Sequence, residues 1–313
     1  MKQFFKNSVG FACLLIGILF LMQLAISYRI KGKTVTGYDT LEVTSNVNAD
    51  LVCLGSSRCW AHFDPDFFEK NYAVKTINIG MNGHSDLTAT ILRLENYLSR
   101  NKAPKFAILN IDPFVSAGSL TNNTNFVTKN DYARFAFFPD EKDEAFLDYF
   151  KFDNTEKYVP LYALFKYQLL SDCLTLKNAN AFKAGFELND EKWDTIKYPI
   201  TAQAKKYFFK PKDIPQIEHA LKTLQQLCQK NNIRLLCIQT PAYKVTYDTA
   251  AFEMPKTLCT KLNIPFTDAN FESVRTKTDC FYNVMHLNKK GVYEMNTLLK
   301  NEKKLGTFFK INP

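Results

Sequence analysis

Residues 50–60 read DLVCLGSSRCW. The first six residues form a short apolar run that ends in Gly55, which is typical of a strand buried in a parallel sheet. Ser56 and Ser57 follow at once, so we expect a hydroxyl at the carboxyl end of the sheet, where open α/β folds bind ligands. An ordinary strand-to-helix turn with a serine N-cap has the same pattern. This segment alone leaves both interpretations open.

Further apolar runs and helical patterns alternate along the chain on both sides of a long middle region. The predicted strands are 75–80 (KTINIG), 106–112 (FAILNID), 233–240 (IRLLCIQT) and 264–268 (IPFTD). Apolar residues at three- and four-residue steps predict helices over 85–100, 214–230, 250–262 and, with Asn288 as N-cap, 288–301. The alternation predicts an α/β three-layer sandwich with a mostly parallel, flavodoxin-like sheet.

The alternation fails between residues 113 and 212, a region rich in Phe, Tyr, Asn and Lys. A structureless loop of that length is improbable in a compact domain. We therefore expect a mostly helical insertion that forms a cap beside the strand ends. The core is expected in two halves, 35–112 and 213–313.

The amino terminus contains an uncharged run over residues 9–28, VGFACLLIGILFLMQLAISY, with only Gln23 and Ser27 as polar interruptions. At about 1.5 Å per residue, about 20 helical residues cross a ~30 Å hydrocarbon core. Lys2 and Lys6 precede the run and favour a cytoplasmic amino terminus, although three basic residues beyond the run weaken that bias.

A cleaved signal peptide is the rival interpretation, because Ala25 and Ser27 form a small-x-small pair before Tyr28. The apolar run is longer than the usual signal core of about 7–15 residues, which favours an uncleaved anchor over residues 1–34. Both interpretations export residues 35–313.

The composition excludes several classes of protein. With 46% hydrophobic and 23% charged residues, the chain is neither disordered nor a multi-span channel. Five basic residues of the net +9 charge lie in the first 34 residues, and the rest form no basic stripe, so we expect no nucleic-acid partner.

The cysteines and histidines show no metal-site spacing, since neither C-x-x-C nor H-E-x-x-H occurs. No metal or organic cofactor is implied. The cysteines outside the anchor are Cys53, Cys59, Cys173, Cys228, Cys237, Cys259 and Cys280. Their odd number cannot all pair, and the sequence indicates no disulfide connectivity.

Four histidines are available for any Ser–His mechanism. His219 is expected on a solvated helix face, and His62 in a structural turn. His84 follows Gly83 near the strand ends and is a candidate to line the site. His286 lies just before the last predicted helix, after the last strand.

These residues resemble the SGNH (GDSL-like) hydrolase superfamily, in particular its membrane-anchored bacterial branch of envelope acyl-esterases and O-acyltransferases. The resemblance covers both ends of the exported chain in the family's order, but not the middle insertion. It implies that Ser57 of the Gly55-Ser56-Ser57 block is the nucleophile and that His286, in an H-L pair, is the general base. It also implies an oxyanion hole formed by the backbone N–H groups of Ser57 and Gly83.

Two positions depart from the family pattern. Asp112, in NIDPF, stands near the place of the family's oxyanion Asn, and an ionised Asp cannot donate a hydrogen bond. Asn283 stands three residues before His286, where the family has Asp. Asn283 can orient the imidazole without supplying charge, or Asp279 or Asp112 substitutes as the acid.

The resemblance implies a serine esterase or O-acyltransferase that acts on acyl esters of a cell-envelope glycan. The expected location is the bacterial inner membrane, with a single pass and an extracytoplasmic (periplasmic) domain. Expected partners are an acylated glycan or small acyl ester, the membrane, and a membrane acyl-transfer partner. Arg58, His84 and Asp112 are candidate substrate contacts, and for Arg58 pairing with a carboxylate is the equal alternative. The alternative function is a catalytically degenerate binding or assembly component of an envelope polysaccharide machine.

Overall fold

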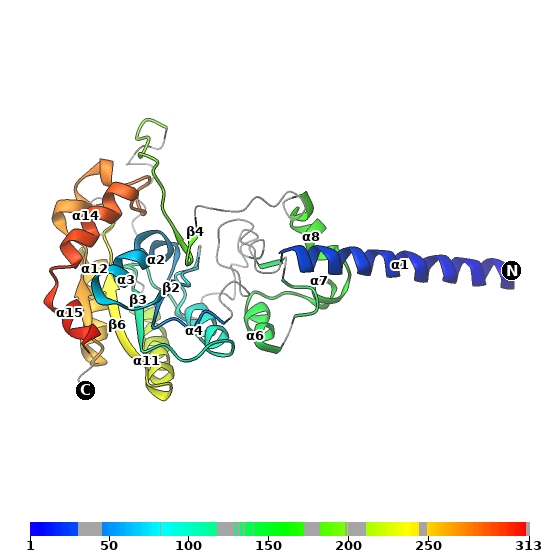
Figure 1. The fold of residues 1–313 in the computed structure, drawn as a ribbon, viewed down its shortest axis with the longest axis horizontal. Coiled ribbons are helices and arrows are strands. Elements are labelled where there is room, and N and C mark those ends of the chain that lie inside the picture. Colours follow the sequence, from blue (N-terminus) through cyan, green and yellow to red (C-terminus); the bar gives the residue numbers. More distant parts are fainter. Residues whose placement is uncertain are drawn as a thin grey trace. The chain divides into compact units, whose positions relative to one another are not determined.

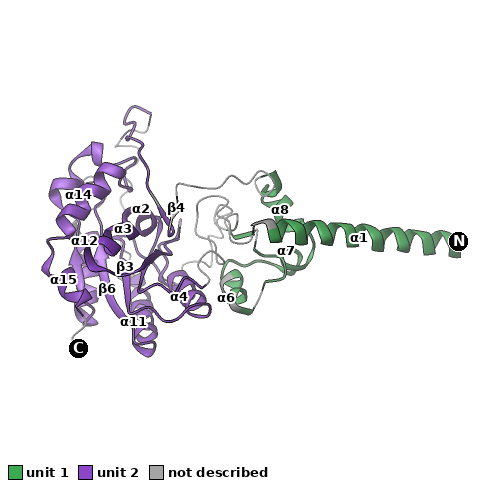
Figure 2. Cartoon of the chain, in the orientation of Figure 1, with its two compact units in different colours: residues 1–43, 122–179 green, residues 44–121, 180–313 purple. Residues whose placement is uncertain are grey.

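The computed structural model describes residues 1–30, 46–81, 83–117, 129, 132–133, 135–139, 141–171, 182–197, 199, 211–243 and 249–310. The chain forms two compact units (Figure 2). Unit 1 comprises Met1–Val43 and Asn122–Ala179, and unit 2 comprises Thr44–Thr121 and Asn180–Pro313.

Unit 2 is built on a five-stranded parallel sheet in the order β2-β1-β3-β6-β7 (Figure 1). The strands are β1 (Leu51–Leu54), β2 (Thr76–Asn78), β3 (Phe106–Asn110), β6 (Arg234–Gln239) and β7 (Phe266–Asp268). The order reverses at β1, and open α/β sheets bind ligands beside such a reversal, at the carboxyl ends of the strands. Val52 of β1 lies opposite Ile77 of β2 and Ala107 of β3.

Helices cover both faces of this sheet because its strands are apolar on both faces. Leu51 and Cys53 belong to one core cluster, and Val52 and Leu54 to the other. The first cluster contains residues of α2 (Ser57–His62), α3 (Pro65–Tyr72), α14 (Lys289–Leu299) and α15 (Lys303–Phe309). The second contains residues of α4 (Leu87–Leu98), α11 (Ile214–Lys230) and α12 (Thr249–Lys261). The predicted three-layer α/β fold is therefore confirmed.

Short elements complete unit 2. They are the antiparallel hairpin β4 (Phe182–Lys183) and β5 (Phe186–Glu187), η2 (Pro211–Asp213), α13 (Glu272–Arg275) and η3 (Thr278–Cys280). Asn288 is the N-cap of α14, as the sequence predicts, and its side chain accepts a hydrogen bond from Gly291 N at 3.0 Å. The described cysteines are free thiols, while Cys173 lies outside the described residues.

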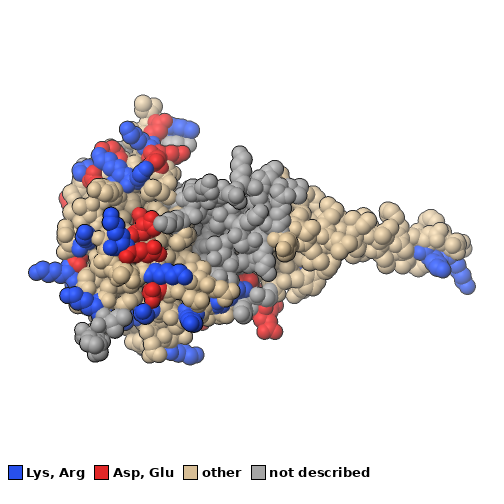
Figure 3. Space-filling model, viewed as in Figure 1, with Lys and Arg blue, Asp and Glu red and all other residues tan. Residues whose placement is uncertain are grey.

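Unit 1 contains α1 (Lys2–Ile30), α6 (Glu141–Tyr149), α7 (Asn154–Tyr158) and α8 (Tyr162–Lys166). Among the described residues, α1 is the one helix long and apolar enough to cross a membrane, with a mean hydropathy of 2.6 over its most apolar window. On the face shown in Figure 3, α1 carries charge only near its amino terminus, whereas basic and acidic residues intermingle over unit 2.

The insertion predicted over 113–212 is divided between the units, since residues 122–179 group with α1, and residues 113–121 and 180–212 group with the sheet. Much of it, including 118–128, 172–181 and 200–210, lies outside the described residues. The described part of 122–179 contains three short helices. The role of this insertion as a cap stays a prediction.

Candidate active site

The turn after β1 presents Ser57 at the carboxyl end of the sheet. Gly55 has a φ of 140°, and a Cβ there would lie 2.9 Å from Asn110 O, so this turn requires glycine. Ser56 then caps α2, its side chain accepting a hydrogen bond from Arg58 N at 3.2 Å. Ser57 is thus the first residue of α2, and Ser56, the other candidate hydroxyl, is buried as the cap.

His286 lies in a closed loop between η3 and α14. Phe281 and Leu287 pair as an antiparallel bridge at the ends of this loop, and Tyr282 N donates to His286 O at 3.1 Å. The Tyr282 ring stacks on the imidazole, with centroids 5.3 Å apart and an interplanar angle of 9°. The ring of His286 is therefore held by backbone pairing as well as by stacking.

Ser57, His286 and Asn283 form a continuous hydrogen-bonded row, which we call the candidate row. Ser57 Oγ lies 2.8 Å from His286 Nε2, although 229 positions separate the two residues. His286 Nδ1 lies 3.0 Å from Asn283 Oδ1. The same amide oxygen accepts from Met285 N at 2.9 Å and from His286 N at 3.0 Å. The Asn283 side chain therefore stabilises the turn that leads to His286 and also orients the imidazole ring.

The electrostatics of the candidate row keep the imidazole neutral. Burial and the charge of Arg58 lower the pKa of His286 to about 3. The Asn283 side chain is an amide and offers no charge to stabilise an imidazolium. At neutral pH the hydrogen bond from Nδ1–H to Asn283 leaves Nε2 as an acceptor for the Ser57 proton.

Arg58 and Asp112 are packed into the interior and do not face a substrate. Their side chains are 0% and 2% exposed, and Arg58 Nη1 lies 3.2 Å from Asp112 Oδ1. Arg58 Nη2 also donates to Thr240 O at 2.5 Å and Pro241 O at 2.9 Å. Arg58 therefore has the carboxylate partner that the sequence left as one of two alternatives. Because pairing and burial take up both charges, the structure gives no support to substrate contact by Arg58 or Asp112. Burial raises the pKa of Asp112, while Arg58, Ser56 and Asn110 act to lower it.

A chain of buried hydrogen bonds connects this ion pair to the loop that carries His286. Leu287 N donates to His62 Nε2 at 3.0 Å, and His62 Nδ1 lies 2.8 Å from Thr240 Oγ1. Thr240 Oγ1 donates to Asn110 Oδ1 at 3.0 Å, and Asn110 Nδ2 donates to Asp112 Oδ1 at 3.1 Å. Because Nε2 accepts from Leu287, the proton of the neutral ring is on Nδ1. We call Arg58, Asp112, Asn110, Thr240 and His62 the buried cluster.

Three members of this cluster were not among the predicted site residues, namely His62, Asn110 and Thr240. The sequence places His62 in a structural turn, whereas it lies in the last turn of α2, fully buried, one hydrogen bond from the residue after His286. Burial lowers the pKa of His62 well below its usual value, and Arg58 and His286 add to that effect. Its spacing of five residues from Ser57 is the only feature of the sequence that could have drawn attention to it.

Asp279 does not take the place of the missing acid. Its carboxylate, 54% exposed, pairs with Lys290, and this pairing lowers its pKa. Asp112 is held by Arg58, and the partner of His286 Nδ1 is Asn283. Of the three candidates for orienting His286, the structure therefore places Asn283 in that position.

Gly83 and His84 lie in the loop after β2. Gly83 is exposed and has a φ of 73°, a left-handed conformation that favours glycine. His84 is 6% exposed, and burial lowers its pKa to about 4, with Asp86 opposing the shift. The predicted roles of Gly83 as an oxyanion donor and of His84 as a substrate contact stay predictions.

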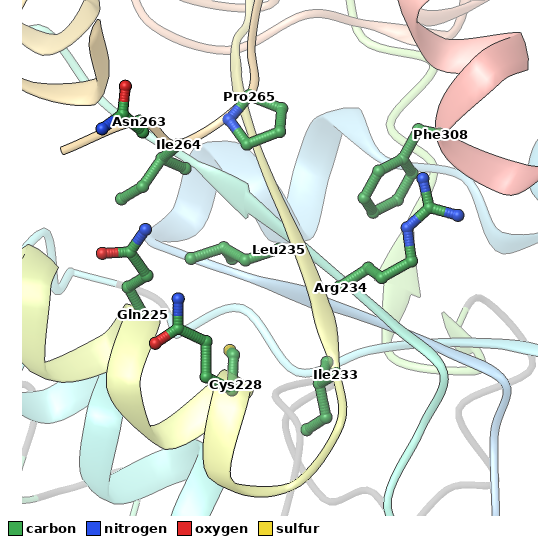
Figure 4. Close-up of a pocket in the computed structure, with 10 residues that line it drawn as sticks. Gln225, Cys228, Ile233, Arg234, Leu235, Asn263, Ile264, Pro265 and Phe308 are labelled. Carbon is green, nitrogen blue, oxygen red and sulfur yellow. The ribbon is translucent and has the colours of Figure 1, made fainter. Parts of the chain in front are cut away.

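A cavity of about 250 Å³ lies elsewhere in unit 2 (Figure 4). Its lining includes Arg234 and Leu235 at the amino-terminal end of β6 and Ile264 and Pro265 just before β7. The candidate row follows the carboxyl ends of parallel strands, so this cavity is at the opposite edge of the sheet. In the described part of the chain, His, Cys, Asp and Glu form no group of three suited to a metal ion.

Comparison with known proteins yields only distant likenesses. No family model matches the chain, and no curated protein matches it. A solved structure described as a "putative acylhydrolase" from Bacteroides fragilis matches with a TM-score of 0.37 and 14% identity, over 82% of this chain and 87% of that one. A "putative lipolytic protein of G-D-S-L family" from Desulfitobacterium hafniense matches with a TM-score of 0.38 and 10% identity, over 80% of this chain and 97% of that one. Both likenesses are too weak to carry an argument about function, which rests on this chain's own site.

Proposed function

We propose that this protein is a membrane-anchored serine esterase or O-acyltransferase that acts on acyl esters of a cell-envelope glycan. The observation that carries the proposal is the 2.8 Å contact between Ser57 Oγ and His286 Nε2, with Asn283 holding the far side of the ring. A nucleophile, a base and an orienting group in one hydrogen-bonded row are the parts that acyl transfer requires.

In the first half of the reaction, Ser57 Oγ attacks the ester carbonyl carbon while His286 Nε2 takes the hydroxyl proton. The tetrahedral intermediate collapses, the bond to the alcohol oxygen breaks, and His286 returns its proton to that oxygen. The products of this half-reaction are a free alcohol and an acyl group on Ser57. Asn283 accepts from Nδ1–H throughout and keeps Nε2 directed at the serine.

The oxyanion needs hydrogen-bond donors, because the row itself supplies no positive charge in its resting state. The backbone N–H of Ser57 is at the start of α2, where amides lack intrahelical acceptors. We assign this N–H and that of Gly83 as the oxyanion donors. Asn110, at the end of β3, uses its amide group on Asp112 and Thr240 inside the buried cluster.

In the second half, His286 Nε2 takes a proton from the incoming nucleophile, which attacks the acyl carbon. The bond from that carbon to Ser57 Oγ then breaks, and His286 returns the proton to Oγ, which regenerates the free serine. Water as nucleophile gives hydrolysis, and a sugar hydroxyl gives transfer. The expected location supports a glycan substrate. Helix α1 would hold the domain at a membrane, and Lys2 and Lys6, which precede its uncharged run, favour an amino terminus in the cytoplasm. The domain would then face the cell envelope.

A serine-reactive fluorophosphonate tests this proposal directly, because the probe needs an activated serine but no knowledge of the substrate. We expect covalent labelling of wild type and of Ser56→Ala, and none of Ser57→Ala. Ser56→Ala is the matched control, since it removes the neighbouring hydroxyl. It should cost about 1 kcal/mol of stability as a lost N-cap, and about 1–3 kcal/mol more because Ser56 Oγ also donates to the buried Asp112 carboxylate, so folding of this variant is checked by thermal unfolding. Wild type that resists the probe while correctly folded would overturn the proposal.

A second candidate function, a binding or assembly component of an envelope polysaccharide machine, is favoured by one observation. The orienting group on His286 is an amide, and an amide in that position of a serine triad costs about 10⁴-fold in rate. Papain-like proteases nevertheless use an Asn as third member beside a catalytic Cys–His pair. Binding of a glycan without labelling of Ser57 would select this second function.

A further inference from the structure

The part of unit 1 around α7 and α8 exposes an unusual number of large apolar side chains. We call this set the aromatic face; its members are Phe138, Tyr158, Val159, Tyr162 and Phe165. Phe165 is 61% and Phe138 58% exposed. The rings of Phe138 and Tyr158 are 5.3 Å apart, and Tyr162 and Phe165 are three residues apart on α8 and so lie on one side of that helix. Exposed apolar patches often mark interaction sites.

The aromatic face is attached to the last third of α1 by direct contacts. Gln23, a polar interruption in the apolar run, is 2% exposed, and its Oε1 accepts from Leu161 N at 2.8 Å. The ring of Phe20 lies 6.0 Å from that of Phe138, which in turn lies 5.3 Å from Tyr158. Leu161 is in the turn between α7 and α8, so these helices are fixed at the level of Gln23.

The geometry of a membrane-spanning helix determines how deep Gln23, and the residues that pack against it, lie in the bilayer. If the hydrocarbon core begins at Val9, Gln23 lies about 21 Å along the helix, about 9 Å short of the far boundary of a ~30 Å core. If the span instead begins at Phe4, about 20 residues bring Gln23 to the boundary itself. In both registers the residues that pack against Gln23 lie at the depth of the leaflet on the carboxyl-terminal side of α1.

The chemistry of the aromatic face suits that depth. Tyrosine, together with lysine and arginine, is enriched where a protein crosses from lipid to water, and the face contains Tyr158 and Tyr162. Lys166 Nζ lies 5.7 Å from the Tyr162 ring centroid and 2.6 Å from the buried carboxylate of Glu156. Glu156 also binds Lys129 at 3.2 Å, so the acid beside the face is compensated within unit 1.

We propose that the aromatic face contacts lipid and seats unit 1 in the interfacial region of the bilayer that α1 crosses. The proposal rests on the membrane anchor but not on the chemistry of Ser57. In this arrangement α1 also sets the depth of the α7–α8 segment in the bilayer, because the two are joined by direct contacts.

Tryptophan substitution with brominated lipids tests the depth. The full chain is reconstituted in vesicles of phosphatidylcholine with or without bromine on the acyl chains. The native Trp60 and Trp193 are buried in unit 2 and supply a constant background. Phe165→Trp and Tyr162→Trp probe the face, and Tyr293→Trp, an exposed position on α14, is the matched control. Leu14→Trp reports on the anchor itself.

We expect the added emission of Phe165→Trp and Tyr162→Trp to be lost to brominated lipid, and that of Leu14→Trp to be lost to brominated lipid as well. Tyr293→Trp should respond only to aqueous acrylamide. Quenching of Leu14→Trp without quenching of either face variant would overturn the proposal and leave the anchor standing. If lipid did not quench Leu14→Trp, both the membrane anchor and the lipid contact of the aromatic face would be overturned. If lipid quenched Tyr293→Trp as strongly as the face variants, the contact would not be specific to the aromatic face. None of these outcomes depends on fluorophosphonate labelling.

Discussion

The candidate row and the buried cluster are neighbours in unit 2, yet they use polar groups in opposite ways. The row, with Ser57, His286 and Asn283, contains no formal charge at neutral pH, because the pKa of His286 is lowered to about 3. The cluster contains the ion pair of Arg58 and Asp112, both withdrawn from solvent. The formal charges of this site therefore lie in the buried cluster, behind the candidate row.

Ser57 and Arg58 show how adjacent residues divide between the two regions. Successive side chains on a helix point about 100° apart, so two consecutive residues of α2 face different surroundings. Ser57 turns towards His286, and Arg58 turns towards Thr240 and Asp112. The following predictions separate what each region contributes.

The largest effect is expected from Ser57→Ala in the candidate row. Loss of the nucleophile should lower ester turnover by a factor on the order of 10⁴ to 10⁶. Turnover of an identified ester is the measurement, and thermal unfolding is the control, since no charge or core group is removed. A variant that keeps a tenth of wild-type activity would contradict the assignment.

Asp112→Asn should act on stability, because it leaves the buried Arg58 guanidinium without a countercharge. Breaking one partner of a buried pair costs about 3–5 kcal/mol. Urea unfolding measures this loss. Asp279→Asn is the control, because that exposed carboxylate pairs with Lys290 at the surface and its removal should leave the midpoint nearly unchanged. Equal losses of stability in the two variants would mean that the buried ion pair contributes no more to folding than the exposed one.

Asn283→Asp should alter the pH dependence of the row. The lowered pKa keeps His286 neutral far below its usual titration range, so wild-type activity should stay level from pH 8 to about 5. A carboxylate beside Nδ1 favours the imidazolium and should raise the pKa by about 1–3 units, moving the acid limb upwards and increasing turnover. The pH–rate profile and NMR titration of His286 measure the shift, with Asn283→Ala as control. An unmoved acid limb in Asn283→Asp would show that residue 283 does not act on the ring.

The smallest effect is expected from His62→Phe, which breaks the connection between the two regions. Leu287 N and Thr240 Oγ1 would each lose a buried hydrogen-bond partner, which lowers the free energy of unfolding by about 1–3 kcal/mol per group. The loop that carries His286 would then be held less rigidly. We expect kcat to fall about tenfold with little change in KM, as for residues that support a catalytic group indirectly. His62→Gln retains a donor and an acceptor and should restore part of the loss. Full activity of His62→Phe would remove His62 from the positioning role.

Much of the fold was predictable because its signals are local. Apolar runs such as FAILN of β3 and the spacing of α11 identify elements within a few residues of their observed bounds. Asn288 as N-cap and Asn283 three residues before His286 also lie within one turn of what they contact. The pairing of Ser57 with His286 was predictable at longer range, because parallel strands bring their carboxyl ends to one edge.

Other features depended on contacts that no local pattern encodes. The sequence alone could not tell whether Arg58 faces a substrate or a carboxylate 54 positions away, since that depends on how α2 packs over β3. The role of His62 depends on Leu287, 225 positions distant, and that of Gln23 on Leu161, 138 positions distant. The sequence by itself determined the five strands of the parallel sheet, the longer helices and the residue types of the site, because backbone propensity and hydrophobic periodicity act over a few residues. Tertiary structure alone decided which polar groups lie in the candidate row and which are paired in the buried cluster, because a buried donor or acceptor must find its partner wherever packing brings one.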